Sequence, residues 1–117
     1  VMVSNVAYSK LTVKKVPAFM SQDIVTKLLR EELGFDGIVM TSPLNDNVIE
    51  NNYTNEFAVV EAVKAGWDLI VLPGNFKECY EALITAVEEG RIDEKVINTS
   101  VRRILQNKIQ RGILVLE

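Results

Sequence analysis

The side chains that could do chemistry in this sequence are carboxylates, hydroxyls and amides. The 117 residues include no histidine and one cysteine, Cys79, so the commonest general base and the commonest transition-metal ligand are both missing. One cysteine also excludes an internal disulfide and a thiolate zinc cluster. Polar side chains gather in residues 41–52, among them Ser42, Asn45 and Asp46. These groups could hydrogen-bond a hydroxyl-rich ligand, or they could form an ordinary polar loop.

Composition and charge narrow the class of protein. Apolar residues make up 48% and charged residues 25%, which is typical of a globular chain rather than a disordered or fibrous one. Thirteen basic and sixteen acidic residues give a net charge of −3, which disfavours a nucleic-acid partner. The apolar runs are too short to span a bilayer, so no membrane partner is expected. No basic start precedes an apolar core, so this segment is expected to carry no secretory signal.

Strands and helices are predicted to alternate along the chain. Three apolar segments, residues 1–8, 38–40 and 69–72, are predicted strands. Residues 41–52 are predicted to be a loop. Helix starts are predicted at Ser21, Thr54, Asn75 and Asp93, and helix ends at Gly34, Gly66, Gly90 and Gly112. The helical side chains predicted to face a core are Ile24, Val25, Leu28, Leu29, Leu33, Phe57, Val60, Val63, Tyr80, Leu83, Ile84, Val87, Val96, Ile97, Val101, Ile104, Leu105 and Ile109.

Some prominent side chains are predicted to be structural. Trp67 lies just before the third predicted strand, at the end where a barrel keeps its stabilising residues, so it is expected to pack in the core. Cys79 has no histidine or flanking cation to activate it and is expected to be inert. The basic residues of the last helix are expected to form a solvated face; they are Arg102, Arg103, Lys108 and Arg111.

The spacing of the strands indicates a particular α/β architecture. The predicted strands end near Asn5, Thr41 and Leu72, which are 36 and 31 residues apart. A (β/α)8 barrel has about 31 residues per strand–helix unit. A doubly wound domain usually has more strands, and a free-standing α/β interaction domain would need another copy to cover its sheet edges. We therefore predict three consecutive βα units plus a C-terminal helix, a partial TIM-barrel domain over residues 1–117 with no second domain.

Several segments resemble glycoside hydrolase family 3, and most closely its bacterial β-N-acetylhexosaminidases. The similarity lies in residues 1–8, 17–18, 28–39, 62–68 and 100–105, and its most specific part is the leucine-rich helix followed by Gly34-Phe35-Asp36-Gly37. The resemblance implies that the chain supplies the sixth, seventh and eighth strands of a catalytic barrel, with their helices. It also implies a bacterial protein of the cytoplasm or the cell envelope.

The resemblance also implies where a catalytic site would lie. The family's nucleophile is an aspartate just after the seventh strand, and Ser42 stands at that position. A histidine commonly follows the sixth strand, and Asn5 stands there. Asp46 is the nearest carboxylate and the one possible substitute, while Asn5 and Asn45 are candidate substrate-binding residues. The acid/base His–Asp loop of the hexosaminidases would precede residue 1, so we expect the chain alone to be inactive.

The expected parent activity is hydrolysis of terminal β-linked N-acetylglucosamine from cell-wall or chitin-type saccharides, with no metal and no organic cofactor. The alternative is a non-catalytic carbohydrate-binding or scaffold domain that has lost the nucleophile. The expected partners are a saccharide and either the remaining, N-terminal part of the barrel or further copies of this chain in a homo-oligomer.

Overall fold

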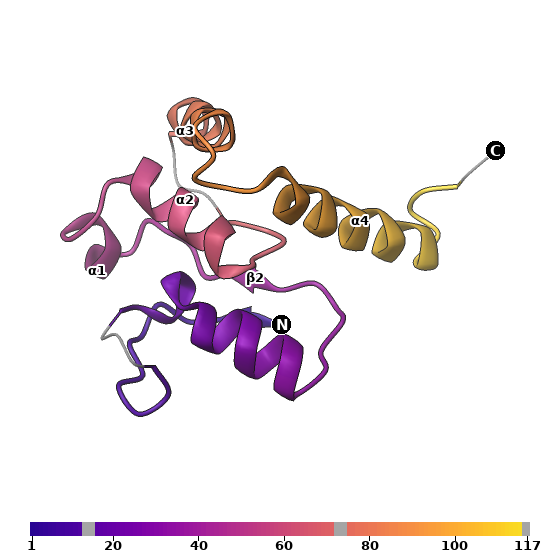
Figure 1. Ribbon diagram of the computed structural model, residues 1–117, viewed down its shortest axis with the longest axis horizontal. Helices are drawn as coiled ribbons and strands as arrows, with labels where there is room; N and C mark the ends of the chain where they lie inside the picture. The colour runs from indigo at the N-terminus through magenta and orange to yellow at the C-terminus, as the bar shows by residue number, and fades with distance from the viewer. Residues whose placement is uncertain (13–15, 72–74, 116–117) are drawn as a thin grey trace.

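The computed structural model describes residues 1–12, 16–71 and 75–115. In chain order the elements are β1 (Met2–Val3), η1 (Ala18–Met20), η2 (Asp23–Glu32), β2 (Met40–Thr41), α1 (Asn47–Glu50), α2 (Asn55–Ala65), α3 (Phe76–Glu88) and α4 (Glu94–Gln110). Figure 1 shows η2 beneath α2, with α3 above α2 and α4 extending to one side. η1 is a 3-10 helix and η2 a π-helix, in which the N–H of Leu33 donates to the carbonyl of Leu28 at 2.9 Å.

The strands are parallel and shorter than the sequence predicts. β1 pairs with β2 in the register Met2↔Met40 and Val3↔Thr41, and Leu69 forms an isolated parallel bridge with Met40. The predicted strand over 1–8 is therefore wrong beyond residue 3, the strand over 38–40 moves to 40–41, and the strand over 69–72 is reduced to its bridge. Leu72 lies outside the described residues. A segment forms a strand only where the backbone of a neighbouring segment donates hydrogen bonds to it and accepts hydrogen bonds from it.

Local signals for helix ends are partly confirmed. Thr54 caps α2 by accepting the N–H of the third residue on, at 3.2 Å, and Asp93 caps α4 by accepting the N–H of the second, at 2.9 Å. Gly66 ends α2 with a φ of 103°, a conformation that favours glycine. Asn75 directly precedes α3 as predicted, but its side chain makes no cap bond, and the start predicted at Ser21 is displaced by one residue, because the residue before η2 is Gln22.

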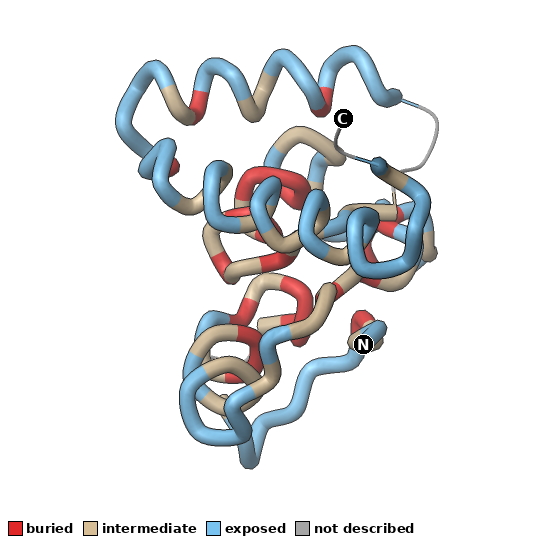
Figure 2. The backbone as a smooth tube through the Cα atoms, turned by 90° about the vertical axis from the view of Figure 1, so that its right-hand side faces the viewer, coloured by how far each residue is buried: buried red, intermediate tan, exposed pale blue. Residues whose placement is uncertain are grey.

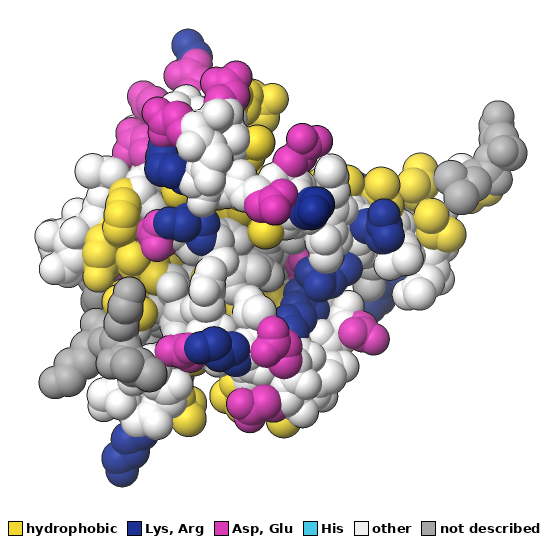
Figure 3. All heavy atoms as spheres, viewed as in Figure 1, with side chains coloured by type: hydrophobic (Ala, Val, Ile, Leu, Met, Phe, Trp, Pro, Cys, Tyr) yellow, Lys and Arg dark blue, Asp and Glu magenta, His cyan; other side chains and the backbone are white. Residues whose placement is uncertain are grey.

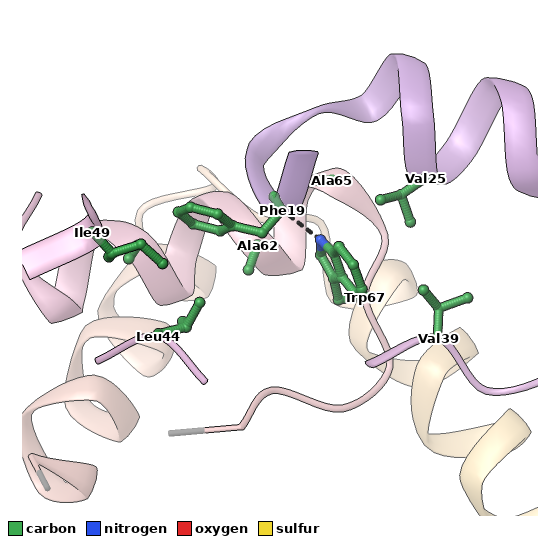
Figure 4. Packing of buried hydrophobic residues seen from close by; sticks show 9 residues of the cluster. Phe19, Val25, Val39, Leu44, Ile49, Ala62, Ala65 and Trp67 are labelled. Carbon is green, nitrogen blue, oxygen red and sulfur yellow. Dashed lines mark hydrogen bonds between the residues drawn. The ribbon is translucent and has the colours of Figure 1, made fainter. Parts of the chain in front are cut away.

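The core lies around α2. Figure 2 shows the buried residues concentrated there, while α3 and α4 are largely exposed. Trp67 is 1% exposed, and its indole N–H donates to the carbonyl of Phe19 at 2.6 Å, as Figure 4 shows. The packing role predicted for Trp67 is confirmed. The indole fixes η1 against the end of α2, and a buried indole needs such an acceptor.

Several helical side chains predicted to be inward are exposed. Leu33 and Phe57 are 68% and 46% exposed. α4 has no buried residue, although its helical pattern is confirmed over Glu94–Gln110. The apolar periodicity predicts these helices correctly, but two short strands and one bridge give the helices little surface to cover. The other exposed members of the predicted faces are Tyr80, Ile84, Val101, Leu105 and Ile109.

A buried ion network joins three segments. The Asp68 carboxylate is fully buried and accepts hydrogen bonds from Arg30 at 2.5 Å, from Arg103 at 3.0 Å and from the backbone N–H of Val39 at 3.0 Å. Arg30 also donates to the Gly37 carbonyl at 2.6 Å. The solvated role predicted for Arg103 is therefore wrong, because its guanidinium ties α4 to the residue that precedes the Leu69 bridge.

Candidate functional site

A pocket of about 770 Å³ opens beyond the carboxyl ends of the two strands. All four residues singled out from the sequence line it, although they come from two distant segments of the chain. Open ends of parallel strands are where α/β proteins build their sites. The lining residues are Ser4, Asn5, Val6, Ala7, Pro17, Ser42, Pro43, Asn45 and Asp46.

The segment over 41–52 is an anchored structure rather than a polar loop. It contains helix α1, and its side chains Leu44 and Ile49 are fully buried in the core. The backbone N–H of Leu44 donates to the carbonyl of Val71 at 3.1 Å. The N–H of Ile49 donates to Asp46 Oδ1 at 3.0 Å, so this carboxylate caps α1. The candidate residues Ser42, Asn45 and Asp46 are consequently held by two buried anchors.

Asn5 follows β1 and reaches across to the other segment. Its Nδ2 donates to the carbonyl of Pro43 at 3.1 Å and to Asp46 Oδ2 at 2.5 Å. Two acceptors face the same end of the amide, so the opposite orientation would place oxygen against oxygen and is excluded. Asn5 is only 9% exposed. The pair joins the two walls of the pocket.

Ser42 is held by the backbone of β1. Its N–H and its hydroxyl both lie 3.2 Å from the carbonyl oxygen of Val3 and donate to it. A carbonyl does not remove a proton, so nothing in this contact activates the hydroxyl as a nucleophile. Asn45 is exposed and lies at the lining of the pocket.

The charge at the pocket comes from one group. Among the described residues that line the pocket, Asp46 is the only one with a carboxylate or amine side chain, so these residues contribute one negative charge. In the described part of the chain, no three His, Cys, Asp or Glu side chains gather as metal ligands would. Within the same ranges, no helix is both long and apolar enough to cross a membrane.

Other lining residues were missed from the sequence. Ser4 precedes Asn5, and its hydroxyl lies 3.1 Å from that of Tyr8, so the polar run after β1 was an available signal. Pro17 reaches the pocket because the N–H of Ala18 donates to the carbonyl of Val6 at 3.0 Å. No local sequence pattern predicts this contact, because it joins two segments that are more than ten residues apart in the chain.

Comparisons with known proteins place this geometry in a family. The family model described as "Glycosyl hydrolase family 3 N terminal domain" matches residues 1–107. A β-N-acetylglucosaminidase of this family from Paenibacillus sp. str. FPU-7 superposes with a TM-score of 0.89 at 36% identity, over 99% of this chain and 24% of that one.

Two relatives carry different activity names. A β-glucosidase from Rhizobium radiobacter is 37% identical over 70% of this chain, and β-hexosaminidase A from Pseudoalteromonas piscicida is 28% identical over 92%. The chain spans 9% and 21% of the lengths of these two relatives. The match over residues 1–107 covers the pocket and nearly every element around it, and the chain therefore belongs to glycoside hydrolase family 3.

Proposed function

We propose that this chain is the saccharide-binding part of a family 3 barrel and that it does not hydrolyse glycosides by itself. The observation that carries the proposal is the engagement of Ser42, whose hydroxyl donates to the Val3 carbonyl at 3.2 Å. A retaining glycosidase needs a nucleophilic carboxylate and a second acid/base group, with carboxyls about 5–5.5 Å apart. Asp46 is the only carboxylate that the described residues bring to the pocket, and N–H groups of Asn5 and Ile49 already bind its two oxygens.

The proposed architecture is the last part of the catalytic barrel, namely three βα units that correspond to strands 6, 7 and 8, plus a C-terminal helix. The parallel order of β1, β2 and Leu69 supports this assignment, as does the superposition on a quarter of the Paenibacillus structure. In such a barrel the pocket would lie on the face where these enzymes bind substrate.

A second candidate is a working hydrolase assembled from this chain and the remaining barrel units. The relatives' names favour it, and they favour terminal β-linked N-acetylglucosamine and β-linked glucose equally. The non-catalytic reading rests instead on the contacts of Ser42 and Asp46. The two candidates differ in whether the assembled barrel turns over substrate.

The test is an assay of the purified chain with aryl β-N-acetylglucosaminides and aryl β-glucosides, paired with NMR titration by N-acetylglucosamine and glucose. We expect chemical-shift changes at Asn5 and Ser42 and no release of the aryl group. Turnover that survives repurification and disappears in Asp46→Ala would make Asp46 the nucleophile and overturn the proposal. Failure of every sugar to shift the pocket residues would also overturn it.

A further inference from the structure

The strongest unexplained group in the described residues is the carbonyl oxygen of the Asn5 side chain. Asn5 Oδ1 is shielded from solvent and has no hydrogen-bond partner within the described ranges. A buried acceptor without a donor is costly, and native proteins rarely keep one without a use. Asn5 also lines the pocket beyond the two strands, so the unmet acceptor belongs to the wall of a candidate binding site.

The orientation of this amide is set by the protein and not by a ligand. Its nitrogen donates to the Pro43 carbonyl and to Asp46, and Asp46 is itself fixed by the N–H of Ile49 at the start of α1. Rotating the amide would lose both donated bonds, so the amide keeps this orientation. Whatever meets Oδ1 must therefore supply an N–H or O–H, because a carbonyl oxygen only accepts.

The charge of the pocket restricts the ligand further. Asp46 contributes the only charge among the described side chains that line the pocket. Its carboxylate disfavours a ligand that brings a second negative charge and favours one that brings a positive charge. The remaining wall is largely apolar through Val6, Ala7 and Pro17, which suits the carbon face of a sugar ring. Because Oδ1 is shielded, a ligand can meet it only if residues 4–6, which belong to no helix or strand, move.

We propose that Asn5 is the specificity-determining acceptor of this pocket, and that it selects a sugar presenting a hydrogen-bond donor, with an amino sugar preferred and an anionic sugar refused. Asp46 is the positioning residue that fixes the Asn5 amide and supplies the charge preference. This inference rests on the proposed saccharide-binding function, and it adds the chemical class of the sugar.

The test compares three monosaccharides that differ in charge, namely glucosamine, glucose and glucuronic acid, by NMR titration of the whole chain near pH 6. We expect glucosamine to bind about fivefold more tightly than glucose, the ratio for opposite charges about 4 Å apart in water. Glucuronic acid should not bind at accessible concentrations. Asn5→Leu should lower the affinity for glucosamine and for glucose alike by about three- to tenfold, the range for one lost hydrogen bond.

Asp46→Asn removes the charge and keeps an oxygen that can cap α1, while its NH2 group faces the Nδ2 donor of Asn5, so both sugars should also bind more weakly. In this variant the ratio of glucosamine to glucose affinity should fall to about one. The matched control is Asp93→Asn, which changes the capping residue of α4 far along the chain and should leave the ratio unchanged. Circular dichroism and urea unfolding of each variant exclude loss of the fold as the cause.

Each outcome decides one of the two claims. If none of the sugars binds, both the proposed function and this inference fall. The inference alone is wrong if sugars bind but glucuronic acid binds as tightly as glucosamine. It is also wrong if the folded Asn5→Leu variant binds glucosamine and glucose as tightly as the unaltered chain does. A ratio that persists in Asp46→Asn would remove Asp46 from the proposal, whereas its loss in Asp93→Asn would show that the preference does not come from the pocket.

Discussion

Replacing Asp68 by asparagine should destabilise the chain more than almost any other single isosteric change. The side chain is fully buried and accepts bonds from Arg30, Arg103 and the Val39 N–H. Asparagine has the same volume as aspartate, but it carries an NH2 group and no charge. One of the two arginine guanidinium groups would then face another donor, and both would lose their counter-ion. The Arg30 side chain is 11% exposed and therefore cannot recover its hydration.

The expected loss follows from the burial of the network. Breaking a buried pair by removing one partner costs about 3–5 kcal/mol. Arg103 is 29% exposed and can be partly solvated, so the lower end, about 3 kcal/mol, applies here. With a slope of about 1.5 kcal/mol per M of urea, the midpoint should fall by about 2 M. Trp67, buried against Phe19, reports the transition by fluorescence.

Asp93→Asn is the matched comparison, since it makes the same chemical change at an exposed helix cap where asparagine is equally good. Its midpoint should move by less than about 0.3 M. A shift for Asp68→Asn no larger than that, at an unchanged slope, would refute the reasoning and show that the two arginines are satisfied without the carboxylate.

The remaining predictions concern the pocket, the cysteine and assembly. Ser42→Asp alone should leave the chain inactive on aryl β-N-acetylglucosaminides, because the acid/base group is still missing; turnover in this single variant would place that group within the chain. Burial, with smaller contributions from Glu56 and Glu78, raises the pKa of the Cys79 thiol. The unfolded thiol therefore ionises first as pH rises past about 8.5, so the free energy of unfolding should fall above that pH, and urea titrations of Cys79→Ala should lack this decline. Because β1 pairs only with β2 in the described structure, and apolar side chains line the outer side of α4 (Figure 3), the chain should self-associate, which sedimentation equilibrium would detect. A cooperative monomer at micromolar concentration would contradict that expectation.

Features encoded by a few neighbouring residues could be read from the sequence. The cap at Thr54 and the stop at Gly66 depend on bonds within one turn, and both are found where the residue types place them. The family was also accessible, because its most specific run, residues 28–39, is continuous. Four of the pocket-lining residues, Asn5, Ser42, Asn45 and Asp46, could be singled out from the polar run over 41–52 and from the resemblance, and parallel strands bring their carboxyl ends to one edge.

Features that depend on distant partners could not be read in the same way. Asn5 and Asp46 are 41 residues apart, and nothing local to either residue announces their hydrogen bond. Strand limits failed for the same reason, because the apolar run 1–8 extends well past the point where β2 stops pairing. Arg103 belongs to a basic run typical of a solvated face, and only the position of the buried Asp68 carboxylate turns it inward.

The parallel pairing has a consequence for how the chain reaches this fold. Met2 pairs with Met40, and Met40 with Leu69, so these described strand contacts close loops of 38 and 29 residues. Neither contact can begin as a hairpin. Each loop closure costs chain entropy before any backbone hydrogen bond between the strands has formed to offset that cost. Helices α2 and α4 can form within microseconds from local contacts. The rate-limiting event should then be the docking of β1 onto β2, and folding should be slower than that of a helical bundle of equal length. A newly made chain would meanwhile leave the backbone groups of Met2 and Val3 unpaired until residue 40 and its neighbours have emerged and ordered.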